Sequence, residues 1–266
     1  MTPDAFSDPP KLTPDPKAVD LDRPGTREFC NEAVKRTFGE MSYDLEAHKK
    51  YFHDMTQAQK HALLHYFAEK GDVNHHFYYL ISDPEINRHI KDQKGNTALQ
   101  NSIRNDHYDI SHYLIDSQSS NIKDNDGKSP LHVACEKKHV ASVRSLLQHN
   151  GNPLAVDVNS ETPIQVAIRN QNMEVLHTVM NYASEIGAVE VVKHLLENYQ
   201  SYNDEGRALF TAVENNQETV AQCLIAHGYD VNQKRSGLGT TPLHTAALAG
   251  ATACVKLLLS SGANAA

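Results

Sequence analysis

The chain has 266 residues, with 25 Lys and Arg against 33 Asp and Glu, so its formal net charge is −8. This acidic balance argues against a nucleic-acid-binding protein, which normally presents a basic face to phosphate. No apolar run approaches the roughly 20 residues that cross a bilayer, and Met1–Lys11 lacks the apolar stretch of an ordinary signal peptide. Hydrophobic residues make up 39%, enough to build a core, so we expect a soluble protein.

Proline dominates the N-terminal tail. Six of the 11 prolines precede residue 25, with Asp and Lys between them. Proline fixes φ and removes an amide donor, so this stretch forms neither a regular helix nor a central strand. Residues 1–25 are therefore predicted to be an extended or disordered tail. The alternative is a docking peptide, or a strap along the domain surface.

A small helical cap is predicted over residues 26–56. Apolar residues from Phe29 to Phe38 recur at helical spacing, and Gly39 follows as a stop. Residues 45–55 can form a second short helix. The apolar face of this cap needs a surface to pack on, most simply the first unit of the segment that follows.

Residues 57–266 repeat themselves. Three segments align directly, a fourth is weaker, and two more are degenerate: Gly127–Cys135, Ser160–Ile168, Gly239–Ala247, Gly95–Ile103, Ala62–Ala68 and Arg207–Val213. We call the threonine-like position of each copy its anchor; the anchors are Ala62, Thr97, Ser129, Thr162, Arg207 and Thr241. Their spacings are 35, 32, 33, 45 and 34 residues, so four of the five lie near 33. Such recurrence is typical of a stacked repeat protein.

These units resemble ankyrin repeats, whose period is 33 and whose signature is T-P-L-H-x-A. The resemblance implies an all-α solenoid of about six helix-turn-helix units, one with an insertion, behind the short N-terminal cap. The anchor hydroxyl is expected to cap the first helix, and the proline after it suits the first helical position. The family also uses the histidine, as at His65, His132 and His244, to tie the turn to the next unit.

The spacing of 45 leaves about twelve extra residues, which we place at about 183–199. Two segments between the fourth and fifth units resemble a second ankyrin helix, Met173–Met180 and Gly187–Glu197. We interpret them as an inserted or lengthened helix that breaks the regular stack. It is either a tolerated loop expansion or a kink that reshapes the binding surface.

Signals for an enzyme are weak. The sequence has no phosphate-binding glycine loop and no G-x-S-x-G elbow. His61 and His65 have the spacing of a zinc pair but lack the Glu of H-E-x-x-H. The competing hypothesis is an enzyme whose active site lies in residues 26–56 plus the insertion, with Cys30 as a thiol nucleophile, or in a part outside this chain. We expect no catalysis, no metal and no cofactor.

The function that we expect instead is binding of a partner protein. Ankyrin repeats present a concave surface made of hairpin tips and first helices, and stacking makes it rigid. Carried onto this chain, the partner-binding residues are Tyr66, Glu69, Asp92, Lys94, Asn101, Arg104, Asp126, Lys128, Val133, Lys137, Val166, Arg169, Glu214 and Arg235. Their mixed charges favour a polar protein surface as ligand, with Tyr66, Arg104 and Arg169 as the expected hot spots.

The degenerate repeats and proline-rich head resemble the ankyrin-type effectors that intracellular bacteria secrete into host cells. On this hypothesis the protein is a monomer that binds a host protein in the host cytosol. The alternatives are a cytoplasmic eukaryotic adaptor, or the ankyrin targeting module of a longer enzyme.

Overall fold

The computed structural model describes residues 20–22, 25–39, 50–200, 202–235, 237 and 239–265. Within these ranges the regular elements are helices, and one isolated antiparallel bridge pairs Lys91 with Thr97. The all-α class is therefore confirmed. Most of the tail predicted over residues 1–25 lies outside the described residues, as does much of the cap between residues 40 and 49.

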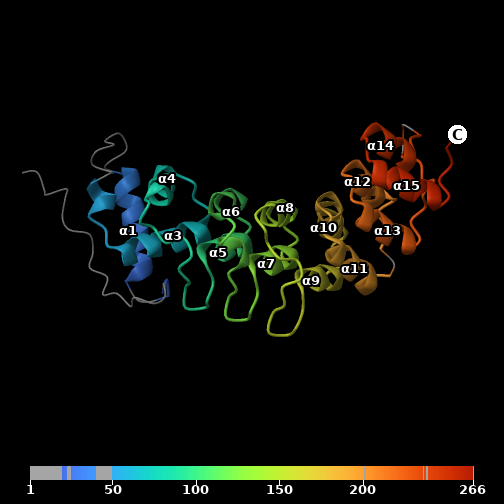
Figure 1. The fold of residues 1–266 in the computed structure, drawn as a ribbon. Coiled ribbons are helices and arrows are strands. Elements are labelled where there is room, and N and C mark those ends of the chain that lie inside the picture. The colour runs from blue at the N-terminus through green and yellow to red at the C-terminus, as the bar shows by residue number, and fades with distance from the viewer. Residues whose placement is uncertain are drawn as a thin grey trace, which may run out of the picture.

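The helices form a stack of antiparallel pairs in two rows (Figure 1). A leading helix, α1 (Thr26–Gly39), packs on α3. The pairs that follow are α3 (Gln57–Lys70) with α4 (His75–Ser82), α5 (Ala98–Arg104) with α6 (Tyr108–Leu114), α7 (Pro130–Glu136) with α8 (Val140–Gln148), and α9 (Pro163–Arg169) with α10 (Met173–Ile186). Then come α11 (Val189–Asn198), α12 (Arg207–Glu214) with α13 (Glu218–Ala226), and α14 (Pro242–Leu248) with α15 (Thr252–Ser260). A short 3-10 turn, η1 (Ser119–Asn121), follows α6.

The first helices begin as the repeat pattern predicts. Anchor side chains cap α5, α7, α9 and α14, and the side chain three residues later accepts the anchor's own amide, which completes a capping box. A proline stands at the start of α7, α9 and α14, where its missing amide costs nothing. Threonine, serine and proline at these positions therefore determine where each unit starts.

The histidine position ties three of the units to the next hairpin, as predicted. His132 is fully buried; its Nδ1 accepts the Ser129 amide, so its Nε2 donates to the Glu161 carbonyl at 3.0 Å. His65 contacts the Ile90 carbonyl in the same way at 3.0 Å. Gln100 replaces histidine but donates to the Lys128 carbonyl at 2.9 Å. Glutamine therefore performs the same task as histidine here.

Buried histidines make the stability of the stack depend on pH. Burial lowers the pKa of His61, His65 and His132 below the ordinary 6.5. The unfolded chain titrates near 6.5, so below this pH it binds protons that the folded chain does not. We expect the contribution of these histidines to the free energy of unfolding to be fully present above about pH 7 and to be lost as the pH drops through about 6. Urea unfolding at pH 8, 7, 6 and 5 measures this dependence.

The matched variant for this measurement is His132→Gln, which removes one titrating ring while keeping the hydrogen bonds that Gln100 makes. Its stability should decline less steeply between pH 7 and 5 than that of the unchanged chain. Carboxylates with lowered pKa values, such as Asp83 and Asp157, lose their contribution only in a lower range. Equal slopes for the two proteins would show that His132 does not carry the effect.

The spacing of 45 results from one long helix that serves two units. Thr178 precedes Gly187 by nine residues, just as the anchor Thr241 precedes Gly250. Ala183 lies where Ala246 lies in the last unit, and both are fully buried. The second half of α10 is therefore a first helix, and α11 is its second helix. The interpretation as a loop expansion is wrong, because this interval is helical.

Two local features keep α10 continuous. Val179 stands where α7, α9 and α14 carry proline, so the amide needed inside a helix is present. Thr178 does not cap a new helix; its hydroxyl donates back to the Glu174 carbonyl at 2.8 Å. The helix ends only at Gly187, whose φ of +78° is the left-handed cap that glycine accepts easily.

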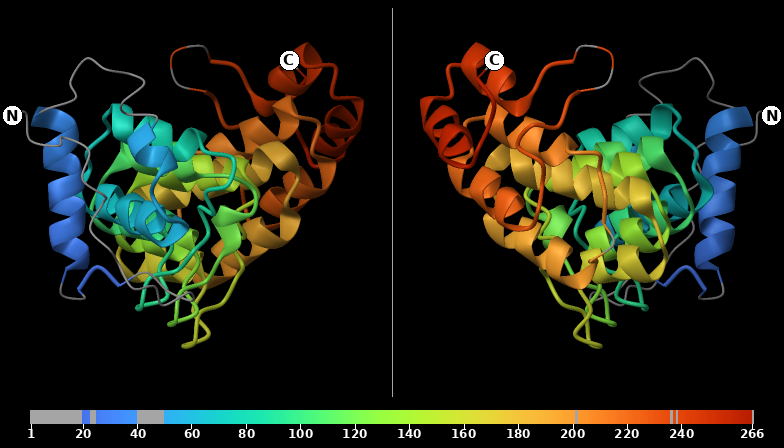
Figure 2. Two further views of the ribbon diagram at one scale, coloured as in Figure 1. Left: turned by 90° about the vertical axis from the view of Figure 1, so that its left-hand side faces the viewer. Right: turned by 90° about the vertical axis from the view of Figure 1, so that its right-hand side faces the viewer.

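Because α10 serves two units, the first helices and the second helices change rows after it. α10 packs against α8 as a second helix and against α12 as a first helix, while α9 continues to α11 and α13 (Figure 1). First helices after α10 therefore lie in the row that holds second helices before it. Figure 2 shows the consequence: the hairpins before α5, α7 and α9 project downwards, whereas the segment leading into α14 projects upwards.

Candidate partner-binding surface

The surface predicted as concave is built by α3, α5, α7 and α9 with the hairpins 92–96, 124–128 and 157–161; we call it the first-helix surface. Each hairpin begins with an aspartate whose carboxylate accepts hairpin amides. Asp124 Oδ1 accepts from Asp126 and Lys128 at 3.0 and 2.8 Å, and Asp157 Oδ1 accepts from Asn159 and Glu161 at 2.8 and 3.0 Å. These bonds fix the hairpins, so their tips are presented in a defined conformation.

Ion pairs join the first helices to the hairpins along this surface. Arg104 contacts Asp124 at 2.7 Å, Lys128 contacts Glu136 at 2.9 Å, and Arg169 contacts Glu161 at 3.0 Å. The helix members stand seven residues after their anchors, so they occupy equivalent places in successive units: Arg104, Glu136 and Arg169. The surface therefore presents cation, anion and cation in sequence.

The electrostatics of Glu136 reflect this arrangement. Its partial burial acts to raise the pKa, but the Lys128 hydrogen bond and the charges of Arg104 and Arg169 outweigh it. The net result is a pKa below the ordinary value. Since one carboxylate responds to cations on α5 and α9, the three units act as one electrostatic surface. Glu136 therefore stays ionised at neutral pH.

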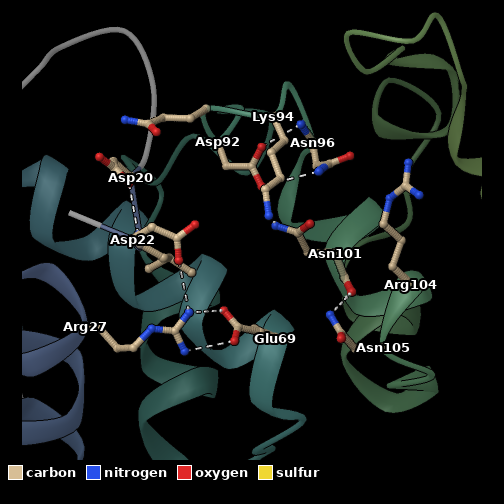
Figure 3. Close-up of a pocket in the computed structure, with 12 residues that line it drawn as sticks. Asp20, Asp22, Arg27, Glu69, Asp92, Lys94, Asn96, Asn101, Arg104 and Asn105 are labelled. Atoms are coloured by element: carbon tan, nitrogen blue, oxygen red, sulfur yellow. Dashed lines mark hydrogen bonds and ion pairs between the residues drawn. The ribbon is translucent and has the colours of Figure 1, made fainter.

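A polar hollow of about 360 Å³ lies at the start of this surface (Figure 3). On one side Arg27 of α1 holds both carboxylate oxygens of Glu69, at 3.0 and 3.1 Å. On the other, Asn101 donates to Asp92 at 2.9 Å, and Lys94 lies beside them. The lining contains both charge signs and amide groups, and suits a polar peptide surface better than an apolar small molecule.

Three predicted contact residues are buried and cannot meet a partner. Val133 and Val166 are 0% and 1% exposed, because the position four residues after the anchor packs between neighbouring first helices. Tyr66 is 7% exposed, because α1 covers it and its hydroxyl donates to Asn31 at 2.5 Å. These three predictions are wrong, and Tyr66 is not a surface hot spot.

The other predicted residues separate into two groups. Nine border the first-helix surface, half-buried or exposed: Glu69, Asp92, Lys94, Asn101, Arg104, Asp126, Lys128, Lys137 and Arg169. Glu214 and Arg235 pair with each other at 2.9 Å beyond the row exchange. They belong to a different surface, so the predicted set does not form one site.

The predicted set leaves out three members of the ion-paired surface, Asp124, Glu136 and Glu161. The signal for Glu136 was present, since it stands seven residues after Ser129, where Arg104 and Arg169 follow their own anchors. Glu161 directly precedes its anchor Thr162. Only the folded hairpin shows that its side chain turns towards Arg169.

The thiol hypothesis for Cys30 is wrong. Cys30 is fully buried, and burial raises its pKa to about 12, so the nucleophilic thiolate is not formed at neutral pH. Burial likewise raises the pKa of Cys135. His61 and His65 do not share a ligand position, because His61 Nε2 accepts the Asn87 amide at 3.2 Å while His65 is held by Ile90.

Helix pairs stacked with projecting hairpins define a solenoid repeat protein. A family model described as ankyrin repeats (3 copies) matches residues 117–186 and 179–266, which together cover 150 of the 266 residues. The chain belongs to the ankyrin-repeat family. The two matches overlap at 179–186, the half of α10 that serves as the first helix of the next unit.

Several known proteins are similar to parts of this chain. Human transient receptor potential cation channel subfamily A member 1 is 28% identical over 52% of this chain and 11% of its own length. Mouse B-cell lymphoma 3 protein homolog is 28% identical over 65% of this chain and 45% of its length. The crystal structure of the Bcl-3 ankyrin domain gives a TM-score of 0.40 at 24% identity, covering 76% of this chain and 86% of that one. The chain thus spans less than half the length of these two full-length relatives.

Among the helices in the described ranges, none combines the length and apolar character that a membrane crossing requires.

Proposed function

We propose that the protein is a non-enzymatic, monomeric scaffold that binds a partner protein through the first-helix surface. The observation that carries the proposal is the alternating series Arg104, Glu136 and Arg169, held by ion pairs to preformed hairpins. Fixed charges of both signs suit a partner surface with the complementary pattern, and a rigid surface loses little entropy on binding.

The test is an affinity capture from eukaryotic cell lysate with Lys94→Glu/Lys137→Glu. Both lysines are exposed at the edge of the surface, so reversing them changes its charge without removing a buried contact. We expect a partner held by the unchanged chain to bind at least about tenfold more weakly to this variant, as like charges meet across the interface. Quantitative mass spectrometry of the captured proteins measures the loss.

Arg104 is unsuitable for this purpose. Its guanidinium neutralises the Asp124 carboxylate, of which only 2% is exposed, so Arg104→Glu would disturb the hairpin. The matched control is Lys193→Glu/Lys256→Glu, with the same charge change on α11 and α15. It should capture the partner like the unchanged chain. Equal loss in both variants, or none in either, would contradict the proposal.

We further propose that the partner is a host protein, as for a bacterial effector acting in the host cytosol. What favours this is the degenerate repeat pattern with its proline-rich head. The alternatives are a eukaryotic cytosolic adaptor and the targeting module of a longer enzyme. Captures from eukaryotic and bacterial lysates test the proposal of a host partner, since an effector should retain a partner only from the eukaryotic lysate.

A further inference from the structure

A second polar groove lies on the opposite side of the stack, where the row exchange places α10 and α12. A hollow of about 570 Å³ is bounded by Asn181, Arg207, Phe210 and the hairpin residues 233–235. A hollow of about 440 Å³ between α8 and α10 adjoins it and shares Asn181 and Arg207. We call the larger hollow the second groove and define it by Asn181, Arg207, Phe210, Lys234 and Arg235; the smaller hollow also carries Glu174 and Glu185.

The larger hollow is basic on an acidic protein. Arg207, Lys234 and Arg235 line it, and Glu205 is its one acidic lining residue. The Arg207 side chain is 62% exposed, and its distance to Glu205 is 3.9 Å, at the outer limit of an ion pair. Lys234 is exposed and has no carboxylate within ion-pair distance among the described residues. Two cations are thus only weakly neutralised, although the chain carries −8.

A third cation is held in place by an aromatic side chain. Phe210 stands where five other units carry histidine or glutamine. It cannot donate a hydrogen bond to the hairpin; instead its ring lies 4.5 Å from the Arg235 guanidinium carbon, and Glu214 pairs with the same group at 2.9 Å. Cation–π contact and ion pair together fix Arg235 at the rim. The departure from the repeat pattern therefore orders the groove.

We propose that the second groove binds an acidic peptide segment of a partner protein, independently of what the first-helix surface binds. Carboxylates match the exposed donors of Arg207 and Lys234, and guanidinium groups hold carboxylates through paired hydrogen bonds. The hairpins before α5, α7 and α9 and the segment leading into α14 project in opposite directions (Figure 2), so one occupant does not block the other. The protein then joins two partners, and the shared helix α10 sets the direction of each.

The experiment selects peptides from a phage-displayed random dodecapeptide library on the whole chain, after subtraction on Arg207→Glu/Lys234→Glu. Both substituted side chains are exposed, and a glutamate at the start of α12 suits the helix dipole, so the variant should fold. We expect peptides with two or more carboxylates. Their affinity by fluorescence anisotropy should fall about tenfold or more in the variant, as two charge-assisted contacts are lost.

Two controls separate this groove from general charge effects and from the first-helix surface. Lys193→Glu/Lys256→Glu should keep the peptide affinity, and so should Lys94→Glu/Lys137→Glu. Peptides without acidic residues, an empty selection after subtraction, or equal losses in all three variants would overturn the proposal. Failure of the lysate capture would leave this result unaffected, because the capture depends on the first-helix surface and the peptide selection on the second groove.

Discussion

Tyr182→Pro is expected to lower the free energy of unfolding by about 3 kcal/mol or more, because proline in a helix interior removes a hydrogen bond and clashes with the preceding turn. Tyr182 lies in the interior of α10, within the second half, which serves as the first helix of the next unit. Stability in a solenoid passes between neighbouring units. Breaking the shared helix should therefore also split the urea transition in two, as followed by circular dichroism.

The control is Glu174→Pro in the same helix. Glu174 is exposed in the first turn, where a proline is tolerated because those amides have no partner inside the helix. This variant should keep a single transition and lose about 1 kcal/mol or less. A single, unshifted transition for Tyr182→Pro would mean that α10 does not join the two halves.

Most of the unit structure was predictable from the sequence because it depends on local chemistry. Serine, threonine and proline at the anchors determine where helices begin, and the period predicts their pairing. The turn between the helices of a pair has glycine at Gly71, Gly187 and Gly250 and another residue in four middle units. These four adopt the left-handed φ of 52–61° that the position requires: Asp106, Lys138, Gln171 and Asn216.

The row exchange was not predicted, because the sequence marks it only by a missing proline. Val179 stands at the proline position but has a backbone amide, so the helix continues through it. Thr178 stands at an anchor position but lies inside a helix. Placing the insertion at 183–199 put the irregularity at the C-terminal end of α10 and in α11, rather than at Thr178 inside α10. Recognising that Thr178 to Gly187 repeats the spacing of Thr241 to Gly250 would have shown the shared helix.

The binding surface was only partly predictable for a related reason. Residues at equivalent positions of the repeat were all assigned to one surface of the protein. The surface on which such a residue lies depends on the row that holds its helix. Glu214 and Arg235 thus lie on the second groove rather than beside Arg169. Burial also depends on neighbours, since Tyr66 is covered by α1, an element outside the repeats.

His132→Ala is expected to lower the free energy of unfolding by about 2–4 kcal/mol, since it opens a cavity and leaves buried polar groups without partners. His132 accepts the Ser129 amide, contacts the Ser129 hydroxyl at 2.8 Å, and donates to the Glu161 carbonyl. The last bond fixes the hairpin from which Glu161 reaches Arg169. The loss should therefore affect the first-helix surface as well as the core, which partner affinity and urea unfolding measure together.

His132→Gln distinguishes the hydrogen bonds from the ring. Gln100 already shows that a glutamine accepts the anchor amide at 2.9 Å and donates to the next hairpin at 2.9 Å. If the bonds carry the stability, His132→Gln should recover all but about 1 kcal/mol of it and restore partner affinity. Equal losses for alanine and glutamine would assign the role to the packing of the imidazole ring. The hydrogen bond from residue 132 to the Glu161 carbonyl would then not be what holds Glu161 in place.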